Sequence, residues 1–450
     1  MTLPRRYSLS YTKDSSDLFS HFHDWVGAVF LDSAKPYSDQ GRYDIFSAEP
    51  INHFHIRVSG EAKALSEELA FTQSNIEACI NDMPQHPDLP FSGGAIGYLG
   101  YDVGEMLHLD EAATGNPVGL PPLFIGIYDW VVVVDHQLKR TELVTQSTAD
   151  PAKIKKILAL LQTPPSVFTK FSLTGAFTSN SDIQQYQQAF NKTQDYIYAG
   201  DCYQINLSRA FSAKYHGQPW AAYLALRKQA AAPFSAYINL PQGQVLSVSP
   251  ERFLAAKQGL IFSQPIKGTA PRSPDPIKDT ALAESLGASE KNRAENVMIV
   301  DLIRNDLSKN CRPGSVKVDK LCELQSFETV HHLVSTVSGT LKPEASAFTA
   351  LIDAFPGGSI TGAPKKRAME IIRELEPHQR GLYCGSVFYL AADGRMDSNI
   401  LIRSFVCENG EIKGFAGGGI VADSNMAEEF DETNTKINRL LDALAAQSVL

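Results

Sequence analysis

The sequence lacks any apolar run long enough to cross a lipid bilayer, which needs about 20 consecutive apolar residues. Its longest apolar run, WVVVVD at 130–135, has the length of a β-strand. The opening stretch, MTLPRRYSLSYTKDSSD, also lacks the apolar centre of a secretory signal peptide. We therefore expect a cytoplasmic protein that does not associate with membranes.

Paired cysteines and basic clusters are missing as well. The six cysteines form no CxxC pair and show no zinc-ligand spacing, so we expect reduced thiols. The formal net charge is −9 and no basic arm offsets it, which argues against nucleic-acid binding. What is present is ordinary: 43% hydrophobic and 20% charged residues, typical of an enzyme with a large core.

The chain contains no internal repeat and no low-complexity tract. Its weakest pattern falls at 161–181, a stretch rich in Pro, Ser and Thr that predicts a linker or surface excursion. We therefore expect an N-terminal subdomain over residues 1–165 and a second subdomain over residues 182–445.

Strands and helices alternate irregularly, and several strands are joined by short connectors such as ENGE and ADGR. Such connectors are typical of hairpins, so the pattern favours a mostly antiparallel α+β fold over a doubly wound parallel sheet. A helix is expected after Ser181 as N-cap, ending near Gly200 as C-cap.

Carboxylates stand at unusual places on two predicted helices. On the closing helix, Glu429, Glu432 and Lys436 fall within an arc of about 60°. Geometry alone favours a plain ion pair between Glu432 and Lys436 on a solvated face. Glu295 shares a face with apolar residues, where a carboxylate needs a cationic partner such as Arg304 or a metal ion. Helical glutamates from distant parts of the chain would suit Mg²⁺, which prefers oxygen ligands.

Two glycine-rich turns could hold an anion. In PGGSITGAPKK, glycines precede a helix, although Ala363 and Pro364 rule out a phosphate-binding loop of the Walker type. The second turn, GFAGGGIVADS at 414–424, exposes a run of backbone amides. Each turn alone is a weak signal, but nearby Arg403 and Lys436 favour an anionic substrate.

Taken together, nine ordered motifs resemble the chorismate-utilising enzyme family. They are SPERF, PIKGT, NRAENVMIVDLIRND, HHLVST, PGGSITGAPKKRAMEII, YCGSVFYL, NILIR, FAGGGIVADS and EEFDETNTK, which cover most of residues 182–440, and GGAIGYLGYDVGE adds a match in the first half. The resemblance implies an α+β fold in which two antiparallel sheets pack as a sandwich with outer helices. It also makes residues 182–445 the chorismate-binding, catalytic subdomain.

Two positions distinguish the branches of this family. Members that add water carry a lysine base where this chain has Gln204, and an amide cannot deprotonate water. Among the ammonia-using members, those that make anthranilate typically read PIAGT, whereas those that aminate chorismate at C4 read PIKGT, as here. The resemblance therefore implies C4 amination, with 4-aminobenzoate and folate downstream, and makes Lys267 a nucleophile that adds to C2.

The family resemblance assigns further roles by matching position. It makes Glu251 the general acid for the departing hydroxyl and places His332 near that group, although such a histidine is more often a packed residue. It makes Glu295, Glu432 and Glu429 ligands of Mg²⁺. The residues expected to bind the substrate are Gln204, Gly268, Thr269, Ser359, Tyr383, Arg403, Gly417, Gly419 and Lys436.

Two partners are implied in the same way. The chain contains no glutaminase segment, so a separate glutamine amidotransferase subunit is expected to form a heterodimer with it and supply ammonia. Bound tryptophan is the second expectation, because related enzymes hold it between two segments that are partly preserved here. The candidate pocket residues are Ser33, Arg42, Tyr43, Pro233, Phe234 and Ser235.

Two alternatives remain at this point. The first is the anthranilate-forming branch, which Lys267 and the eroded tryptophan segments disfavour. The second is a non-catalytic, tryptophan-binding regulatory subunit, which would be expected to have lost the metal glutamates; Glu295 and Glu432 are both present.

Overall fold

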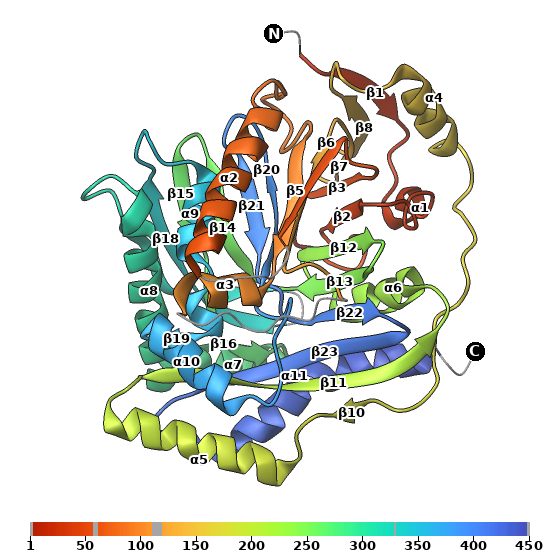
Figure 1. Cartoon of the computed structure of the whole chain (residues 1–450). Coiled ribbons are helices and arrows are strands. Elements are labelled where there is room, and N and C mark those ends of the chain that lie inside the picture. Colours follow the sequence, from red (N-terminus) through yellow and green to blue (C-terminus); the bar gives the residue numbers. More distant parts are fainter. Residues whose placement is uncertain (1–2, 57–61, 110–118, 328–329, 448–450) are drawn as a thin grey trace.

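The computed structural model describes residues 3–56, 62–109, 119–327 and 330–447. In these residues the chain forms two large antiparallel sheets that face each other, with helices on the outer sides (Figure 1). The expected α+β sandwich is thereby confirmed. None of the described helices would span a bilayer.

The larger sheet has 13 strands and the order β1-β8-β7-β3-β2-β12-β13-β22-β23-β11-β10, with β9 and β19 also paired to β11. The bounds of its strands are β1 Arg5–Leu9, β2 Ala28–Asp32, β3 Tyr43–Ser47, β7 Trp130–Asp135, β8 Arg140–Thr145, β9 Ser172–Leu173, β10 Thr178–Ser179, β11 Gln204–His216, β12 Phe234–Leu240, β13 Gly243–Ser249, β19 Gly362–Ala363, β22 Ser404–Glu408 and β23 Glu411–Ile420.

The smaller sheet has 10 strands and the order β16-β18-β15-β14-β21-β20-β5-β6-β4, with β17 also paired to β18. Its strands are β4 Asn52–Ile56, β5 Gly94–Leu99, β6 Leu123–Tyr128, β14 Arg252–Lys257, β15 Leu260–Ser263, β16 Ile266–Pro271, β17 Lys317–Ser326, β18 Val330–Thr340, β20 Ser386–Leu390 and β21 Met396–Asn399.

The run WVVVVD illustrates how the sandwich is filled. It forms β7, and its alternate residues face opposite sides of the sheet. Val131 and Val133 point into the core between the two sheets, together with Ile96 and Tyr98 of the facing sheet. The remaining apolar residues of β7 join the core under the outer helices. A strand buried on both faces reads as a continuous apolar run, which explains its composition.

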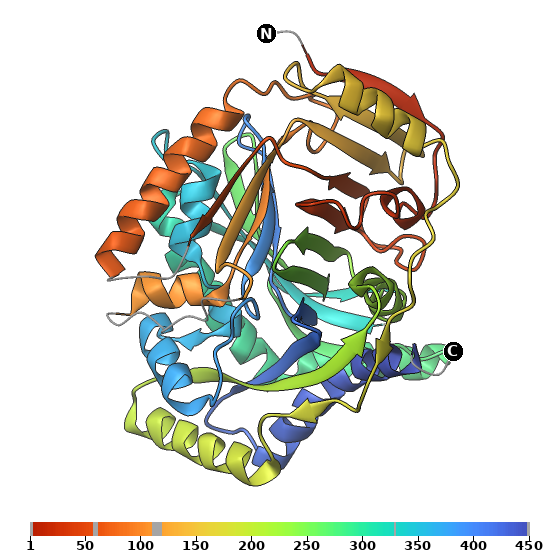
Figure 2. The same cartoon turned by 45° about the vertical axis from the view of Figure 1, so that its right-hand side comes forward.

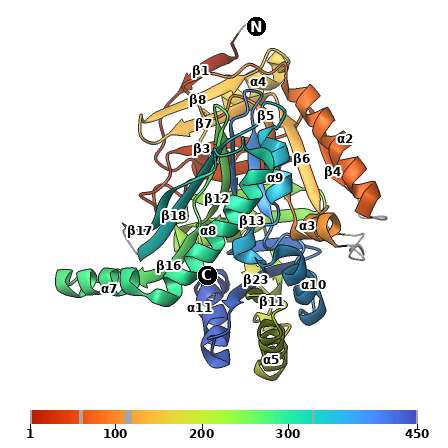
Figure 3. The same cartoon turned by 90° about the vertical axis from the view of Figure 1, so that its left-hand side faces the viewer.

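Helices complete the outer layers (Figures 2 and 3). In one outer core, α2, α3, α8 and α9 pack on the ten-stranded sheet; in the other, α1, α4, α6 and the end of α11 pack on the thirteen-stranded sheet. The helices are α1 Ser16–Phe19, α2 Ala62–Ile80, α3 Tyr101–His108, α4 Pro151–Leu160, α5 Ile183–Ala199, α6 Pro219–Ala230, α7 Pro276–Ala288, α8 Glu290–Asn310, α9 Ala347–Ala354, the 3₁₀ turn η1 Gly358–Ile360, α10 Lys365–Leu375 and α11 Met426–Ala446.

The predicted caps of α5 were right at one end and wrong by one residue at the other. Gly200 ends the helix in the left-handed conformation, with φ of 83°. The N-cap is Asp182, not Ser181, because the Asp182 carboxylate accepts the backbone N–H of Gln185. The Gln185 side chain reciprocates by accepting the N–H of Asp182, which completes a capping box.

Strands from residues 1–165 and from residues 182–445 lie next to each other in both sheets. In the larger sheet β2 pairs with β12, with Leu31 opposite Ala236. In the smaller sheet β5 pairs with β20, with Ile96 opposite Tyr389. Independent folding of either segment would therefore leave strand edges unpaired.

Candidate active site

Glu251 lies where the chain passes from one sheet to the other. Only Pro250 and Glu251 separate β13, in the larger sheet, from β14, in the smaller one. A second crossing, from β21 to β22, runs beside it and contains Arg403; the backbone N–H of Ile400 in this crossing donates to the Glu251 carbonyl at 3.0 Å. The pair of crossings forms a corner of the sandwich at which the two predicted residues meet.

Lys267 reaches the same corner from β16. The register between β16 and β18 shifts between Ile266 and Thr269, so Lys267 and Gly268 occupy an irregular stretch of the strand. Such bulges re-aim side chains. Gly268 has φ of 84°, which favours glycine, and an added Cβ would crowd Leu286 Cδ1 at 3.0 Å. Lys267 Nζ lies 3.4 Å from the backbone carbonyl of Ser359.

Burial controls the ionisation of both residues. Glu251 is 8% exposed, and this burial raises the pKa of its carboxyl to about 7, even though the charges of Lys267, Lys436 and Arg403 oppose the rise. Burial lowers the pKa of Lys267, while the charges of Glu251 and Glu295 oppose the fall. Around neutral pH, the corner can therefore hold a protonated acid close to an amine that loses its proton more readily than usual.

His332 lies opposite Thr269 in the pairing of β18 with β16. Its Nδ1 lies 2.9 Å from Thr269 Oγ1, and burial lowers the pKa of its imidazole, which favours the neutral ring. The neighbouring His331 is fully engaged elsewhere, since its two ring nitrogens lie 3.1 Å from Asp279 Oδ1 and 2.8 Å from Ser326 Oγ. His332 is thus the histidine of the pair that faces the predicted substrate-binding residues.

Two of the three predicted metal ligands share one helix. Glu429 and Glu432 of α11 both approach Gly418: an added Cβ there would lie 2.9 Å from Glu429 Oε2 and 3.8 Å from Glu432 Oε1. Glu429 is 5% exposed, accepts the Ser424 hydroxyl at 2.7 Å, and has its pKa raised by burial. Glu432 forms the expected ion pair with Lys436, at 2.5 Å.

Glu295 comes from α8 instead. Its expected partner Arg304 pairs with Asp301. Both Glu295 and Glu432 act electrostatically on Lys267, so the two helices direct these carboxylates toward one region. Within the described part of the chain, however, no three His, Cys, Asp or Glu side chains are gathered closely enough to hold a metal ion. Glutamate oxygens are ligands that Mg²⁺ prefers. In this structure, however, Glu295 on α8 does not form one cluster with Glu429 and Glu432 on α11.

The glycines of β23 form the floor beside β11. The pairing of β22 with β23 ends at Gly414, so the following residues of β23 have one edge without β22. Gly417 and Gly419 lie opposite Ser208 and Asn206 of β11. An added Cβ on Gly419 would lie 3.1 Å from Gln204 Nε2, while Lys436 Nζ donates to the Gly417 carbonyl at 2.9 Å. Larger residues would fill the space over this floor.

Tyr383 and Arg403 complete the predicted substrate-binding set. The Tyr383 ring stacks on Phe415 of β23 at 5.2 Å between centroids, and the Arg380 guanidinium lies 5.6 Å from the same ring. Arg403 is exposed in the left-handed conformation, with φ of 51°, immediately before β22. Its charge acts on Glu251, consistent with its place at the second crossing.

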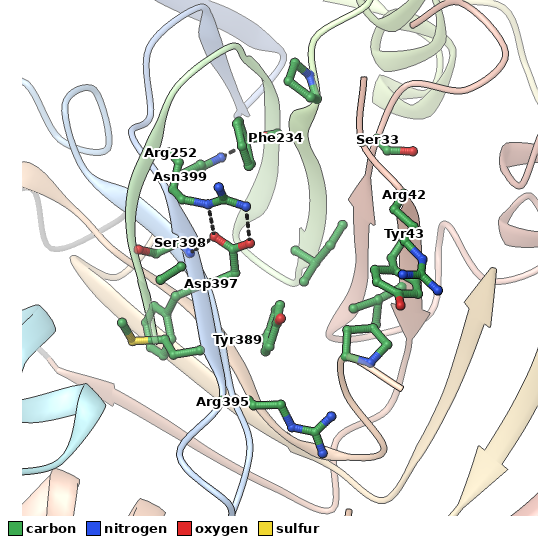
Figure 4. Close-up of a pocket in the computed structure, with 18 of the residues that line it drawn as sticks. Ser33, Arg42, Tyr43, Phe234, Arg252, Tyr389, Arg395, Asp397, Ser398 and Asn399 are labelled. Atoms are coloured by element: carbon green, nitrogen blue, oxygen red, sulfur yellow. Dashed lines mark hydrogen bonds and ion pairs between the residues drawn. The ribbon is translucent and has the colours of Figure 1, made fainter. Parts of the chain in front are cut away.

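The six residues predicted to hold tryptophan line one cavity of about 410 Å³ (Figure 4). This volume falls in the range of small-molecule sites, about 300–1,000 Å³. Ser33, Arg42 and Tyr43 stand on one side, and Phe234 stands across from them. The structure thus brings together two segments that are about 200 residues apart in the sequence.

Much of this cavity wall was missed by sequence reasoning. Arg252 forms a two-pronged ion pair with Asp397, at 2.8 and 2.9 Å, and lies 4.8 Å from the ring of Phe234. Tyr389 and Asn399 line the same cavity from β20 and β21. The hairpin connector ADGR predicted these strands, but nothing in the local sequence indicated which face would meet β2 and β12.

The comparisons with known proteins agree with this arrangement. The model of the family described as "chorismate binding enzyme" matches residues 31–442. Aminodeoxychorismate synthase component 1 of Klebsiella aerogenes is 44% identical over 454 residues, covering 99% of this chain and all of the relative. Anthranilate synthase component 1 of Streptomyces coelicolor is 38% identical over 397 residues, covering 84% of this chain and 77% of the relative.

Among solved structures, anthranilate synthase component I from Streptococcus pneumoniae superimposes with a TM-score of 0.78 at 30% identity, covering 90% of this chain and 93% of that one. The chain belongs to the chorismate-binding enzyme family. Within that family it is a chorismate-utilising enzyme with full-length relatives named aminodeoxychorismate synthase component 1.

Proposed function

We propose that this enzyme aminates chorismate at C4 to give 4-amino-4-deoxychorismate, a step toward 4-aminobenzoate and folate. The observation that carries the proposal is Lys267: it stands in an irregular stretch of β16, and its charge and that of Glu251 act on each other in one buried corner. Full-length similarity to aminodeoxychorismate synthase component 1 supports the same assignment.

The proposed reaction begins with the neutral amine of Lys267. Its lone pair forms a bond to C2 of chorismate, the two ring double bonds shift by one position each, and the C4–O bond breaks. Glu251 gives its proton to the departing hydroxide, so water leaves. A buried carboxyl with a pKa of about 7 keeps a proton for this purpose near neutral pH.

Ammonia completes the exchange in a second displacement. It forms a bond to C4, the double bonds shift back, and the C2–N bond to Lys267 breaks. The nitrogen that has bonded to C4 returns one proton to the Glu251 carboxylate as the amine of Lys267 is restored, so the net change is replacement of the C4 hydroxyl by an amino group. The covalent route requires a free lysine amine, which burial of Lys267 favours.

We propose that residues near the corner of the sandwich orient the substrate. We assign Tyr383, Arg403, Lys436 and the backbone of β23 to the enolpyruvyl carboxylate. Glu295, Glu429 and Glu432 would hold Mg²⁺, which would neutralise the ring carboxylate and draw electron density from the ring. Because these glutamates stand apart, we expect α8 and α11 to draw together when the substrate and the ion bind.

We further propose that ammonia comes from a separate glutamine amidotransferase subunit. The relatives are named as component 1, which implies at least one further component in those proteins. Free ammonium at high concentration should replace that subunit. The 410 Å³ cavity is proposed to hold tryptophan, on the basis of its size and the six lining residues.

Product identity tests the proposal directly. The purified protein would be incubated with chorismate, Mg²⁺ and ammonium at alkaline pH, and the products separated with and without an added aminodeoxychorismate lyase. A 4-aminobenzoate peak that depends on the lyase is the expected result. The alternative function is anthranilate synthase activity. It is supported by the 38% identity to the Streptomyces coelicolor protein, which is named anthranilate synthase component 1. Anthranilate as the product would establish it and leave Lys267 without its proposed role.

A further inference from the structure

Two buried side-chain amides on β11 contain atoms without a hydrogen-bond partner among the described residues. Gln204 is 1% exposed and Asn206 is 8% exposed. Among the described residues, 13 buried side-chain nitrogen and oxygen atoms have no partner, and three of them are Gln204 Oε1, Gln204 Nε2 and Asn206 Oδ1. Buried polar groups are nearly always satisfied by protein or by a bound molecule, so three orphan atoms on two neighbouring side chains point to a small bound molecule, water or ligand, that supplies the missing bonds.

The two amides share one face of the strand. Residues two apart in a strand point to the same side, so Gln204 and Asn206 face together. Leu207, on the opposite side, packs with Tyr186 and Phe190 of the outer helix α5. The amide face is therefore the one turned away from α5.

Glycines leave room beside these amides. An added Cβ on Gly417 would lie 2.7 Å from Asn206 Oδ1, and one on Gly419 would lie 3.1 Å from Gln204 Nε2. Any side chain at these two positions would fill the space that the amides border. The glycine floor and the orphan amides thus form one feature, built from strands that are about 200 residues apart in the sequence.

The backbone of Asn206 ties this feature to the candidate active site. Its N–H donates to the carbonyl of Thr361 at 2.8 Å. Ser359, two residues earlier in the same loop, provides the carbonyl that Lys267 Nζ approaches. Arg380 donates to the carbonyls of both Ile360 and Asn206, at 3.0 and 2.6 Å, which fixes the loop against β11. The orphan amides therefore border the region that Lys267 enters.

The chemistry of the orphan atoms limits the ligand. Gln204 Oε1 and Asn206 Oδ1 are both acceptors and need N–H or O–H donors, whereas Gln204 Nε2 is a donor and needs a separate acceptor, such as an oxygen of the substrate. A hydroxyl of chorismate can donate to only one of them, whereas a small molecule with at least two protons, such as water or ammonia, can donate to both, and ammonia then keeps its lone pair free for attack. Amide oxygens also do not take up a proton from the nitrogen. We propose that Asn206, together with Gln204, binds the ammonia that attacks the substrate; this inference rests on the proposed function.

The test separates the ammonia step from the lysine step. Asn206→Leu removes the amide while keeping a similar shape. With saturating chorismate, its kcat/KM for ammonia should fall by about fivefold or more, the effect of one lost hydrogen bond. The rate at which Lys267 forms the covalent adduct without ammonia, followed by mass spectrometry, should stay within about twofold of wild type. Asn206→Asp should also lower kcat/KM for ammonia, because a carboxylate favours ammonium, which has no lone pair to attack with.

A buried asparagine with a satisfied side chain provides the matched control. Asn310 is 7% exposed, and its Nδ2 donates to Asp353 Oδ2 at 2.7 Å. Asn310→Leu should lower the melting temperature and leave kcat/KM for ammonia unchanged. Asn206→Leu should leave the melting temperature unchanged or raise it, because it removes an unsatisfied buried group.

Three results would overturn the inference. Unchanged kcat/KM for ammonia in Asn206→Leu would remove Asn206 from the ammonia site. Equal slowing of adduct formation would make Asn206 a contact of chorismate rather than of ammonia. A melting temperature lowered as in Asn310→Leu would make its role structural. A wild-type protein that consumes no ammonia would instead overturn the proposed function, and the inference with it.

Discussion

Replacement of Glu251 by Gln tests whether burial of this carboxyl serves the reaction. Glutamine keeps the size and polarity of the side chain but cannot release a proton to the departing hydroxide. General acids of this kind contribute roughly 10²–10⁴-fold to a rate. We therefore expect Glu251→Gln to lower kcat for ammonia-dependent turnover by at least about 100-fold.

The magnitude follows from the pKa. An ordinary glutamate, with a pKa of 4.5, would be protonated in only about 0.3% of molecules at pH 7, whereas a carboxyl with a pKa of about 7 is protonated in about half of them. Burial thus raises the protonated fraction of Glu251 by more than about 100-fold at neutral pH. In the adduct-forming step, the kcat/KM of the wild-type enzyme for chorismate should fall as the pH rises above about 7. The Glu251→Gln variant should not show this fall.

Stability gives a second readout with a definite sign. The folded-state pKa of Glu251 lies above its ordinary value, so between pH 4.5 and 7 the folded protein binds more protons than the unfolded chain. The free energy of unfolding therefore decreases as the pH rises through this window, by about 3 kcal/mol for this group. Glu251→Gln, which cannot ionise, should be at least as stable as wild type at pH 8.

A second buried carboxyl allows a matched control. Glu105 in α3 is 7% exposed, and burial raises its pKa to about 7 as well, but it lies outside the proposed site. Glu105→Gln should reproduce the change in thermal melting with pH while leaving turnover unchanged. If Glu251→Gln kept turnover within tenfold of wild type, or if both variants lost activity equally, Glu251 would not be the acid.

Other changes address the remaining assignments. Lys267→Ala should abolish the adduct, which would have the mass of the protein plus chorismate less one water; an adduct that persists would assign another nucleophile. Glu295→Ala and Glu432→Ala should each abolish Mg²⁺-dependent turnover and leave thermal melting nearly unchanged, and full activity in either would remove that ligand. Phe234→Ala should weaken tryptophan binding by about tenfold or more in calorimetry, and unaltered binding would place tryptophan elsewhere. Limited proteolysis should not release a folded 1–165 fragment; a stable fragment would contradict the interleaved folding of the two segments.

The fold was predicted from two sources, the local hairpin signals and the family resemblance. Short connectors such as ADGR indicated hairpins and a mostly antiparallel fold, whereas the sandwich of two sheets was expected from the family resemblance. The neighbour with which each strand pairs was harder to predict from the sequence. Leu31 pairs with Ala236 and Ile96 with Tyr389 across long separations, and a strand pattern specifies its own two faces but not its neighbour.

The candidate site was also predicted only in part from the sequence. Lys267 and Glu251 were identified through motifs, but the raised pKa of Glu251 depends on burial at a corner where two sheets meet, and no single segment encodes that burial. Asn206 was not identified from the sequence because the feature that marks it is a missing hydrogen-bond partner, which only the structure reveals. Its Oδ1 lacks a partner and lies beside Gly417, far along the chain, where an added Cβ would lie 2.7 Å from it.

The corner explains why this fold can combine the two ionisation states that the proposed reaction needs. A residue inside a strand has its backbone and neighbours fixed by the ladder, whereas a crossing between sheets frees the chain to turn a side chain inward. Glu251 occupies one crossing and Arg403 the other, and the Ile400 hydrogen bond to the Glu251 carbonyl holds them side by side. Because each crossing exists only when both sheets are formed, the burial that raises the pKa of Glu251 depends on the whole sandwich. Partial unfolding of either sheet should therefore remove the proposed general acid along with the proposed substrate-binding surface.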